Sequence, residues 1–484
     1  MSPIKSGLLA STLLLFPSVS FAQDMADEDV IIATASPLTR SIDEAITGQS
    51  ILAGDNLQDR LAATIGETLK LEPGLSSTSF GAGASRPIIR GQGGDRVRVL
   101  TNGIGSIDAS SASPDHAVAV EPAQAERIEV LRGAALLRYG SSGAGGVVNV
   151  IDGRIPDAHP TDGRDVAIRL GASSVDAGSE VAASIDQSLG NFVLHLDGTK
   201  RSASDYTMPT EGESKAQLAS EGEEVPEDFD ERRKLDNSFV ESDSISAGLS
   251  YIGERGFFGV SVQTMNSDYG VPGGHAHGDE DHDHEAEDYD EDHDEDHEDE
   301  EHEGHDEAEE GEGGVTIKLD QTRYDVNGGI NLDGAFERIQ VFGGYADYKH
   351  TEFEPNGEVG TIFKNEGYEI RGELVQAERG GWQAAHGIQY RERDFSAIGE
   401  EAFVPPTKTQ QLGLYSFHDY ELGNGHLEGA VRFETTDQED SVSGTSRNFD
   451  LFSVSGGGDV HLSDAVRIGG TVFRTERAPT TEEL

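Results

Sequence analysis

Apolar and polar residues alternate from about residue 165 onward, in segments of roughly ten residues that are separated by turns. In one such segment Phe192, Leu194 and Leu196 alternate with His195 and Asp197. This period of two predicts β-strands with one apolar and one polar face. The alternation alone fits both a soluble β-sandwich, whose apolar face points inward, and a membrane β-barrel, whose apolar face points to lipid.

The connections between these strands favour the barrel. The turns after even-numbered strands are tight, as at Gly190-Asn191, whereas the connections after odd-numbered strands are mostly longer and richer in acid. Short turns at one rim and long loops at the other are typical of outer-membrane barrels. If the first strand leaves the periplasm, the long loops 207–238 and 270–314 lie outside the cell. Thirteen strands are predicted, near 164–172, 179–188, 191–206, 239–252, 256–269, 315–332, 339–354, 361–377, 382–394, 408–421, 425–438, 448–462 and 465–476.

Residues 23 to about 155 follow a different pattern, in which short apolar runs are interleaved with glycine-rich turns. The runs are Val97 to Leu100, Ile128 to Leu131 and Val147 to Ile151, and one helix is predicted around Leu61 to Leu71. This mixture predicts a small α+β domain with a core of its own.

The first residues predict a secretory signal peptide. Lys5 precedes an apolar run from Leu8 to Phe16, and Ser20-Phe21-Ala22 provides a cleavage site after Ala22. A short buried helix would lack this cleavage pattern. No later stretch reaches the roughly twenty apolar residues of a membrane helix, so membrane insertion would require strands in a closed barrel.

Composition restricts the function. The chain has no cysteine and only four methionines, which excludes disulfides and thiolate sites and argues against a copper(I) thioether site. A formal net charge of -55 argues against nucleic acid and favours cations as ligands. No catalytic constellation stands out, so we do not expect an enzyme. The glycine-rich stretch Gly140 to Gly146 is followed by a predicted strand rather than a helix, and therefore does not resemble a nucleotide-binding loop.

One acidic segment holds half of the 16 histidines. Imidazole nitrogen and carboxylate oxygen together form a ligand set for Zn²⁺, and equally for Ni²⁺, Cu²⁺ or cadmium. The spacing is irregular and the segment is too polar to fold alone, so we expect a flexible, multi-site collector of metal ions. The alternative is a solvated low-complexity loop, but an acidic run of that kind has no reason to concentrate histidine. The histidines are His275, His277, His282, His284, His293, His297, His302 and His305.

Two shorter segments are further metal candidates. Pro114 introduces a turn that can bring the side chains of Asp115 and His116 towards one ion. The two-residue spacing of His350 and Glu352 places both on one face near the outer end of a predicted strand. A turn or capping role for the first pair and a solvated barrel rim for the second are the simpler interpretations from the residues alone.

A β-prone stretch follows the signal peptide, at Val30, Ile31, Ile32, Ala33, Thr34 and Ala35. It is suited to pairing with the edge of another protein, or it forms an ordinary first strand of the domain.

Several motifs together resemble the TonB-dependent outer-membrane receptors. Val30 to Ala35 looks like a TonB box, and the following motifs match the order and spacing of the family's plug domain. They are Ile65 to Leu69 with Pro73-Gly74, Ile89-Arg90-Gly91, Val97 to Leu100 before Asn102-Gly103, Glu126 to Gly133, Tyr139-Gly140 and Gly143 to Ile151.

The resemblance implies an α+β plug domain followed by an antiparallel transmembrane β-barrel in the outer membrane of a Gram-negative bacterium. It implies that TonB, with its inner-membrane energising complex, is a partner through the box. The expected parts are a signal peptide at 1–22, the box segment at 23–40, the plug at 41–155 and the barrel at 160–484, with the histidine-rich loop at 271–314. About thirteen of an expected twenty-two or so strands are present. The end, Arg477 to Leu484, resembles a mid-barrel motif, so the chain is expected to be a fragment.

Within this family the chain resembles the zinc-uptake receptors of the ZnuD type. That resemblance implies that Asp115, His116 and Glu352 bind zinc between plug and barrel, below the collecting loop, and that a histidine beyond the end of this sequence completes the site. The expected function is TonB-driven import of a divalent transition metal, with zinc as cargo and no cofactor. A receptor for a siderophore or haem, which would be expected to use an aromatic- or arginine-rich pocket, and a surface protein that only buffers metal are the alternatives.

Zinc capture by the acidic segment should fail steeply as the pH falls. Imidazole binds metal only when neutral, its ordinary pKa is about 6.5, and the surrounding carboxylates are expected to raise the pKa of these histidines. Protons therefore compete with zinc at a higher pH than they do for isolated histidine. We expect a peptide spanning residues 274–313 to bind Zn²⁺ far more tightly at pH 7.5 than at pH 5 in calorimetric titrations. Equal binding at the two pH values would show that the ligands are carboxylates alone.

Overall fold

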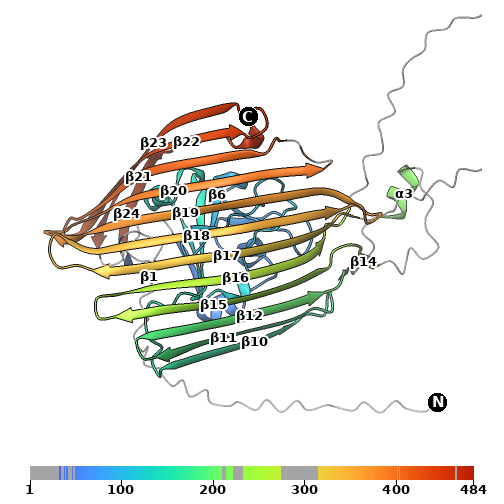
Figure 1. The fold of residues 1–484 in the computed structure, drawn as a ribbon, viewed down its shortest axis with the longest axis horizontal. Helices are drawn as coiled ribbons and strands as arrows, with labels where there is room; N and C mark the ends of the chain where they lie inside the picture. Colours follow the sequence, from blue (N-terminus) through green and yellow to red (C-terminus); the bar gives the residue numbers. More distant parts are fainter. Residues whose placement is uncertain are drawn as a thin grey trace, which may run out of the picture.

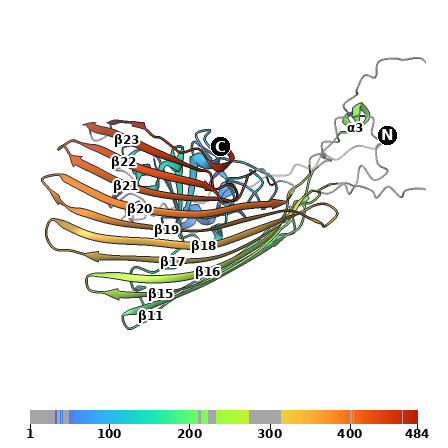
Figure 2. The ribbon, with the colours of Figure 1, turned by 45° about the horizontal axis from the view of Figure 1, so that its top comes forward.

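The structure is a computed structural model in which a large antiparallel sheet curves around a smaller α+β domain (Figures 1 and 2). It describes residues 49–209, 214–221, 233–273, 314–399, 402, 404–463 and 466–483, together with residues 32, 33, 38, 40, 41 and 46. The signal peptide, the eight histidines of the acidic segment and four of the six box residues lie outside the described residues. Of the box, Ile32–Ala33 (β1) pairs with Arg40–Ser41 (β2), so this stretch has a local partner that the sequence did not indicate.

The smaller domain is built on a five-stranded sheet in the order β3-β8-β9-β6-β7, in which only β6 and β9 are parallel. The three predicted apolar runs are confirmed as strands β6, β8 and β9. A two-stranded sheet, several short 3₁₀ turns and two short helices complete the domain. The bounds are β3 Ser50–Ala53, α1 Gly54–Gln58, α2 Ile65–Leu69, β4 Leu75–Ser77, β5 Pro87–Ile89, β6 Val97–Thr101, β7 Ile104–Gly105, β8 Arg127–Leu131 and β9 Gly146–Ile151.

Helix α2 is shorter than the predicted span of Leu61 to Leu71. Its N-cap residue Thr64 has an extended backbone, so the helix cannot begin earlier. Pro73 disfavours helical geometry at the residue before it, and Leu71 is exposed rather than packed. The buried faces of Ile65 and Leu69 join the core of this domain, which also contains Leu52, Leu57, Ile128, Val148 and their neighbours.

The thirteen predicted strands of the large sheet are confirmed, in sequence order, with β10 and β24 at its two edges. Neighbouring strands all pair antiparallel. Three short elements, β13 Tyr206–Thr207, α3 Lys215–Glu221 and β14 Lys234–Leu235, lie in one long connection. The strands are β10 Arg164–Ala172, β11 Ser179–Leu189, β12 Phe192–Ala203, β15 Val240–Gly253, β16 Gly256–Gly270, β17 Thr316–Asn331, β18 Phe336–Phe353, β19 Val359–Arg379, β20 Trp382–Gly399, β21 Thr407–Glu421, β22 Gly425–Asp440, β23 Ser446–Ser463 and β24 Val466–Arg474.

The side-chain alternation decides between the two folds that the sequence left open. On β19, Tyr368 and Ile370 are exposed on the outer surface, whereas Glu369, Arg371 and Glu373 are buried against the enclosed domain. A β-sandwich would place these faces the other way round. The sheet therefore forms the wall of a membrane barrel, with an apolar outer surface for lipid and a polar interior.

The two rims of the sheet differ as predicted. At one rim the connections are short, as at Gly190-Asn191 between β11 and β12 and Gly380-Gly381 between β19 and β20. The connections at the opposite rim include 204–239 and 271–315, and α3 and β14 lie there (Figure 1). Among the described residues, the helices are all too short or too polar to cross a membrane.

Buried charges tie the enclosed domain to the barrel wall. The carboxylate of Glu373 accepts hydrogen bonds from Nε and Nη2 of Arg138 in the enclosed domain, both at 2.5 Å, and another from the hydroxyl of Tyr415. Arg98 pairs in the same way with Glu369. Buried ion pairs hold only when hydrogen bonds satisfy both charges, so these contacts fix the position of the domain inside the wall.

Removing one member of such a pair should be costly. In Glu373→Ala the guanidinium groups of Arg138 and Arg371 lose a buried partner, and we expect the free energy of unfolding to fall by about 3–5 kcal/mol. Arg255→Gln is the matched control, because Arg255 pairs with Asp333 at the exposed rim, where such a pair contributes less than about 1 kcal/mol. Urea-induced unfolding of the purified protein measures both, and equal losses would contradict the structural role of the buried pair.

A charged substitution on the outer surface should destabilise the barrel most near the middle of a strand. Ile370 is an exposed residue in the middle of β19, so Ile370→Arg should lower the free energy of unfolding by about 2–4 kcal/mol in lipid vesicles. Ile362→Arg, near the long-loop end of the same strand, should cost only about 0–1 kcal/mol. A similar cost at both positions would argue against a lipid-facing surface.

Candidate metal site between plug and barrel

A buried turn of the enclosed domain carries His116 towards the long-loop rim of the barrel. The backbone N–H of His116 donates to the carbonyl of Ser113, which closes the turn around Pro114. Tyr269 of β16 holds this turn from the barrel side. Its hydroxyl donates to the carbonyl of Asp115 at 3.1 Å and accepts from the N–H of Ala117 at 2.9 Å. The position of His116 is therefore set by both domains.

His116 meets two side chains from the end of β18. Its Nε2 lies 2.9 Å from Oε1 of Glu352, and Nε2 of His350 lies 3.4 Å from the same oxygen. His350 and Glu352 point inward together because they are two residues apart on one strand. All three residues are buried, and one potential ligand atom from each lies within 4.8 Å of the others.

Hydrogen bonds and ring contacts orient the two imidazoles. Nδ1 of His116 lies 3.0 Å from the carbonyl oxygen of Ala109, and Nδ1 of His350 lies 2.8 Å from the hydroxyl of Tyr348. Both rings also pack on Phe363, with centroid distances of 4.6 Å. The two Nε2 atoms are therefore the ones directed at Glu352, and Nε2 of His350 is buried without a hydrogen bond.

The electrostatics of His116 favour a cation at this place. Burial by itself lowers the pKa of His116, but the hydrogen bond to Glu352 and the negative charge of Asp115 outweigh it and raise the pKa above its usual value. A protonated ring can donate from both nitrogens, to Ala109 and to Glu352. A metal ion at Nε2 would take the place of that proton, while the bond from Nδ1 to the backbone fixes the ring as an outer-shell contact.

The residues present fit a divalent transition metal. Two imidazole nitrogens and one carboxylate oxygen are three ligands of the kind that zinc uses, leaving one position open. Ligand atoms of a tetrahedral zinc site lie about 3.3 Å apart, given bonds of about 2.0–2.1 Å. The separations of 2.9 and 3.4 Å around Glu352 are close to that value.

The structure changes two expectations about these residues. His350 and Glu352 are not at a solvated rim, since they are only 0% and 3% exposed beneath the turn of the enclosed domain. Asp115 is not part of the three-residue group, and its carboxylate accepts a hydrogen bond from Ser113. The third member of the group is therefore His350, where the family resemblance implied Asp115. The period-two spacing of His350 and Glu352 carried this signal, but nothing in the sequence revealed their burial.

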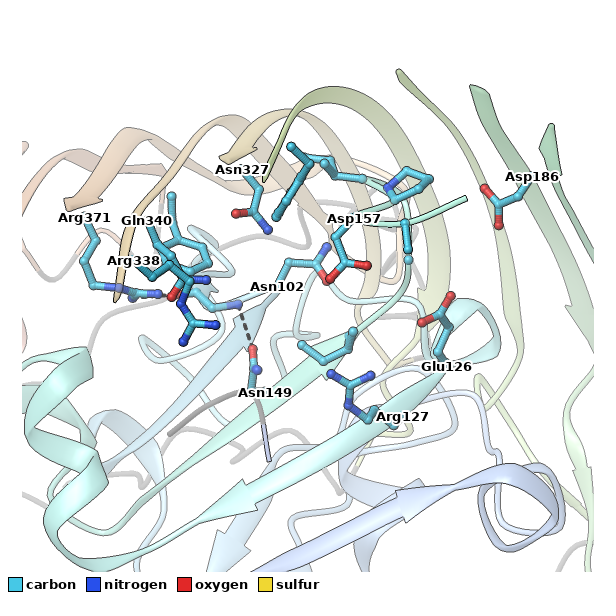
Figure 3. Close-up of a pocket in the computed structure, with 18 of the residues that line it drawn as sticks. Asn102, Glu126, Arg127, Asn149, Asp157, Asp186, Asn327, Arg338, Gln340 and Arg371 are labelled. Carbon is cyan, nitrogen blue, oxygen red and sulfur yellow. Dashed lines mark hydrogen bonds between the residues drawn. The ribbon is translucent and has the colours of Figure 1, made fainter. Parts of the chain in front are cut away.

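A cavity of about 700 Å³ lies near the short-turn end of the barrel, opposite the His116–His350–Glu352 cluster. Arg338, Gln340 and Arg371 come together on one side of it, and Glu126 and Asp186 lie on the other (Figure 3). Between them the side-chain oxygen of Asn149 accepts a hydrogen bond from the N–H of Gly103 at 2.8 Å. Arg338 is near the start of β18 and Glu352 near its end, so the strand joins this cavity to the His116–His350–Glu352 cluster.

Comparison with known proteins identifies the enclosed domain. Residues 41–147 match the family profile of the TonB-dependent receptor plug domain. The vitamin B12 transporter BtuB of Photobacterium profundum is 31% identical over 203 residues, which are 40% of this chain and 32% of that protein. The iron-regulated outer membrane virulence protein of Vibrio cholerae is 31% identical over 158 residues, 31% of this chain and 24% of that protein. The chain thus spans about a third or less of these relatives.

Solved structures agree with the fold at low sequence identity. The copper transporter OprC superposes with a TM-score of 0.66 at 12% identity, covering 90% of this chain and 64% of that one. The FrpB iron transporter of Neisseria meningitidis gives a TM-score of 0.64 at 12% identity, covering 90% and 65%. A plug-domain match inside a barrel wall of this fold places the chain in the outer membrane of Gram-negative bacteria. Residues 41–147 therefore match a TonB-dependent receptor plug domain, set against an antiparallel sheet of thirteen described strands that shares the fold of these solved transporters.

Proposed function

We propose that this receptor imports a divalent transition metal, with zinc as the preferred cargo, by TonB-dependent transport across the outer membrane. The observation that carries the proposal is the buried cluster of His116, His350 and Glu352. Burying three polar side chains away from solvent costs free energy unless a bound metal ion or a proton satisfies them. Their nitrogen and oxygen atoms suit zinc better than calcium or magnesium, which prefer oxygen alone.

The position of the cluster suits capture from outside the cell. It lies at the long-loop end of the barrel, between strands β16, β17 and β18. Ile317, near the start of β17, is paired in register with Glu352, and Tyr269, near the end of β16, holds the His116 turn. The histidine-rich segment connects β16 to β17, so both of its attachment points are next to the cluster. Ions collected by that segment would have a short path to the buried ligands.

The division of the ligands between two domains offers a release mechanism. His116 belongs to the plug, whereas His350 and Glu352 belong to the barrel wall. Any displacement of the plug would separate the ligands and weaken the hold on the ion. A pull by TonB on the segment around Val30 to Ala35 would supply the energy, and the ion would leave towards the cavity near the short-turn rim.

A receptor for a metal chelate is the competing function, and several relatives carry such names, including the hemin receptor of Yersinia pestis. The burial of the cluster favours the bare ion. His116 and His350 are both 0% exposed and pack directly on Phe363, which leaves space for an ion but not for the organic shell of a haem or siderophore.

Calorimetric titration of the purified receptor with Zn²⁺ tests the ligand assignment. We expect one tight site that loses at least about 100-fold in affinity in His116→Ala and in His350→Ala, because a lost ligand should cost more than the 10–100-fold typical of outer-shell contacts. Asp115→Asn should retain most of the affinity. His159→Ala, which removes an exposed histidine from the connection between plug and barrel, is the matched control. A tight site that survives both histidine substitutions would remove this cluster from the mechanism.

Deleting residues 30–35 separates transport from storage. The deletion leaves the cluster intact, so zinc binding to the purified receptor should be unchanged while zinc uptake by cells is lost. A surface protein that only buffers metal would show no difference in cellular zinc accumulation, and that result would contradict the import proposal.

A further inference from the structure

A second, smaller cavity between plug and barrel is lined by four arginines. Its volume is about 100 Å³. Arg86 and Arg98 come from the plug, and Arg391 and Arg393 come from strand β20, where the two-residue spacing directs both inward. The hydroxyl groups of Ser106, Ser111 and Ser142 also line it. Four carboxylates line it as well, from Asp95, Asp108, Glu369 and Glu392, so the pairing of each arginine decides whether an anion fits.

Most of this positive charge has no carboxylate partner. Arg98 pairs with Glu369, but Arg86, Arg391 and Arg393 form no ion pair in the part of the chain that the structure describes. Nε of Arg86 and Nη2 of Arg393 are buried without any hydrogen bond. Arg86 is only 7% exposed. Arginine keeps its proton in proteins, so burying these unpartnered donors costs free energy. A bound anion would remove that cost.

The nearby carboxylates do not fill this role. Asp108 accepts hydrogen bonds from the hydroxyl of Ser110 and the N–H of Ala119. Glu369 is held by Arg98 and by Gln389. Asp95 lines the cavity but pairs with none of the arginines. Glu392, the fourth carboxylate of the lining, accepts hydrogen bonds from Lys408 and Tyr390. Nε of Arg86 and Nη2 of Arg393 therefore keep no acceptor.

We propose that this arginine cavity binds a small oxyanion, a phosphate or a carboxylate group. Guanidinium groups match the paired oxygens of both, and serine hydroxyls complete their hydrogen bonds. A volume of about 100 Å³ corresponds to roughly three water molecules, each of which occupies about 30 Å³ in the liquid. That volume has room for one such group.

The arginine cavity is connected to the metal cluster along two short paths. Asp108 lines the cavity, and the next residue, Ala109, holds the ring of His116. On the barrel side Arg393 lies over the ring of Phe395, which contacts Phe363 beneath His350. An anion in the cavity would therefore lie close to a cation bound at the cluster, and a metal could be taken up together with an anionic group. The anion proposal itself holds whichever cation the cluster binds.

Titration of the purified, metal-free receptor with inorganic phosphate and, separately, with citrate tests this inference. We expect one saturable site for at least one of the two anions, and its affinity should fall by at least about tenfold in the double variant Arg391→Gln, Arg393→Gln, because charge-assisted hydrogen bonds are lost. Tighter phosphate binding would identify a phosphate site, and tighter citrate binding a carboxylate site. The matched control is Arg255→Gln with Arg379→Gln, two exposed arginines at the short-turn rim, which should leave the affinity unchanged.

Two further measurements keep the result unambiguous. His116→Ala should keep the anion affinity while losing zinc, so failure of the metal proposal and failure of the anion proposal can be told apart. Arg393→Lys, which retains the charge but loses the planar fork, replaces the double variant if that protein does not fold, and it should still weaken anion binding. Absence of saturable binding of either anion to the wild-type receptor, or an unchanged affinity in the arginine variants, would overturn the inference.

Discussion

The structure depends on the pairing of buried charges across the boundary between plug and barrel. A barrel wall that is apolar outside must place its polar residues inside, and those residues need partners once water is excluded. Glu369 and Glu373 of β19 find them in Arg98 and Arg138 of the plug. These polar contacts hold the plug together with two hydrophobic clusters that also cross the boundary. The same interface creates the two sites described above.

The His116–His350–Glu352 cluster differs from this pairing of carboxylate with arginine. Elsewhere along the boundary a carboxylate meets an arginine, but Glu352 meets two histidines. Imidazole can exchange its proton for a metal ion, whereas guanidinium cannot. Replacing arginine by histidine at this one contact therefore converts a structural ion pair into a place that a cation can occupy. Because His116 comes from the plug and His350 and Glu352 come from the barrel, this contact depends on how the two domains lie against each other.

Four arginines and four carboxylates line the arginine cavity, yet Arg86, Arg391 and Arg393 form no ion pair among the described residues. Nε of Arg86 and Nη2 of Arg393 are buried without a hydrogen bond, although the chain has a formal net charge of -55. Acidic surface and basic interior are compatible because the surface charges are screened by water and salt, whereas the buried ones interact over short distances at low dielectric. A receptor with neighbouring cation and anion sites can bind a neutral pair at a lower electrostatic cost than either ion alone.

The sequence by itself determined the strands, their rims and the plug. Side-chain direction alternates along a strand and turns require glycine or asparagine locally, so the thirteen strands and the short turns such as Gly190-Asn191 could be predicted without knowing what they pack against. The plug motifs likewise identified the domain that contains Val97 to Thr101 and the neighbouring strands.

Only the tertiary structure decided which face of the sheet is inside and which side chains meet there. His116 and Glu352 are 236 residues apart, and no local pattern specifies that they touch. His350 looked like a rim residue until the plug turn was found to cover it, and the carboxylate of Asp115, expected as a ligand, is bonded to Ser113 outside the three-residue group. Arg86 and Arg393 carry no signal in the sequence at all, since the shortage of partners that makes them informative arises only when the barrel wall closes over the plug.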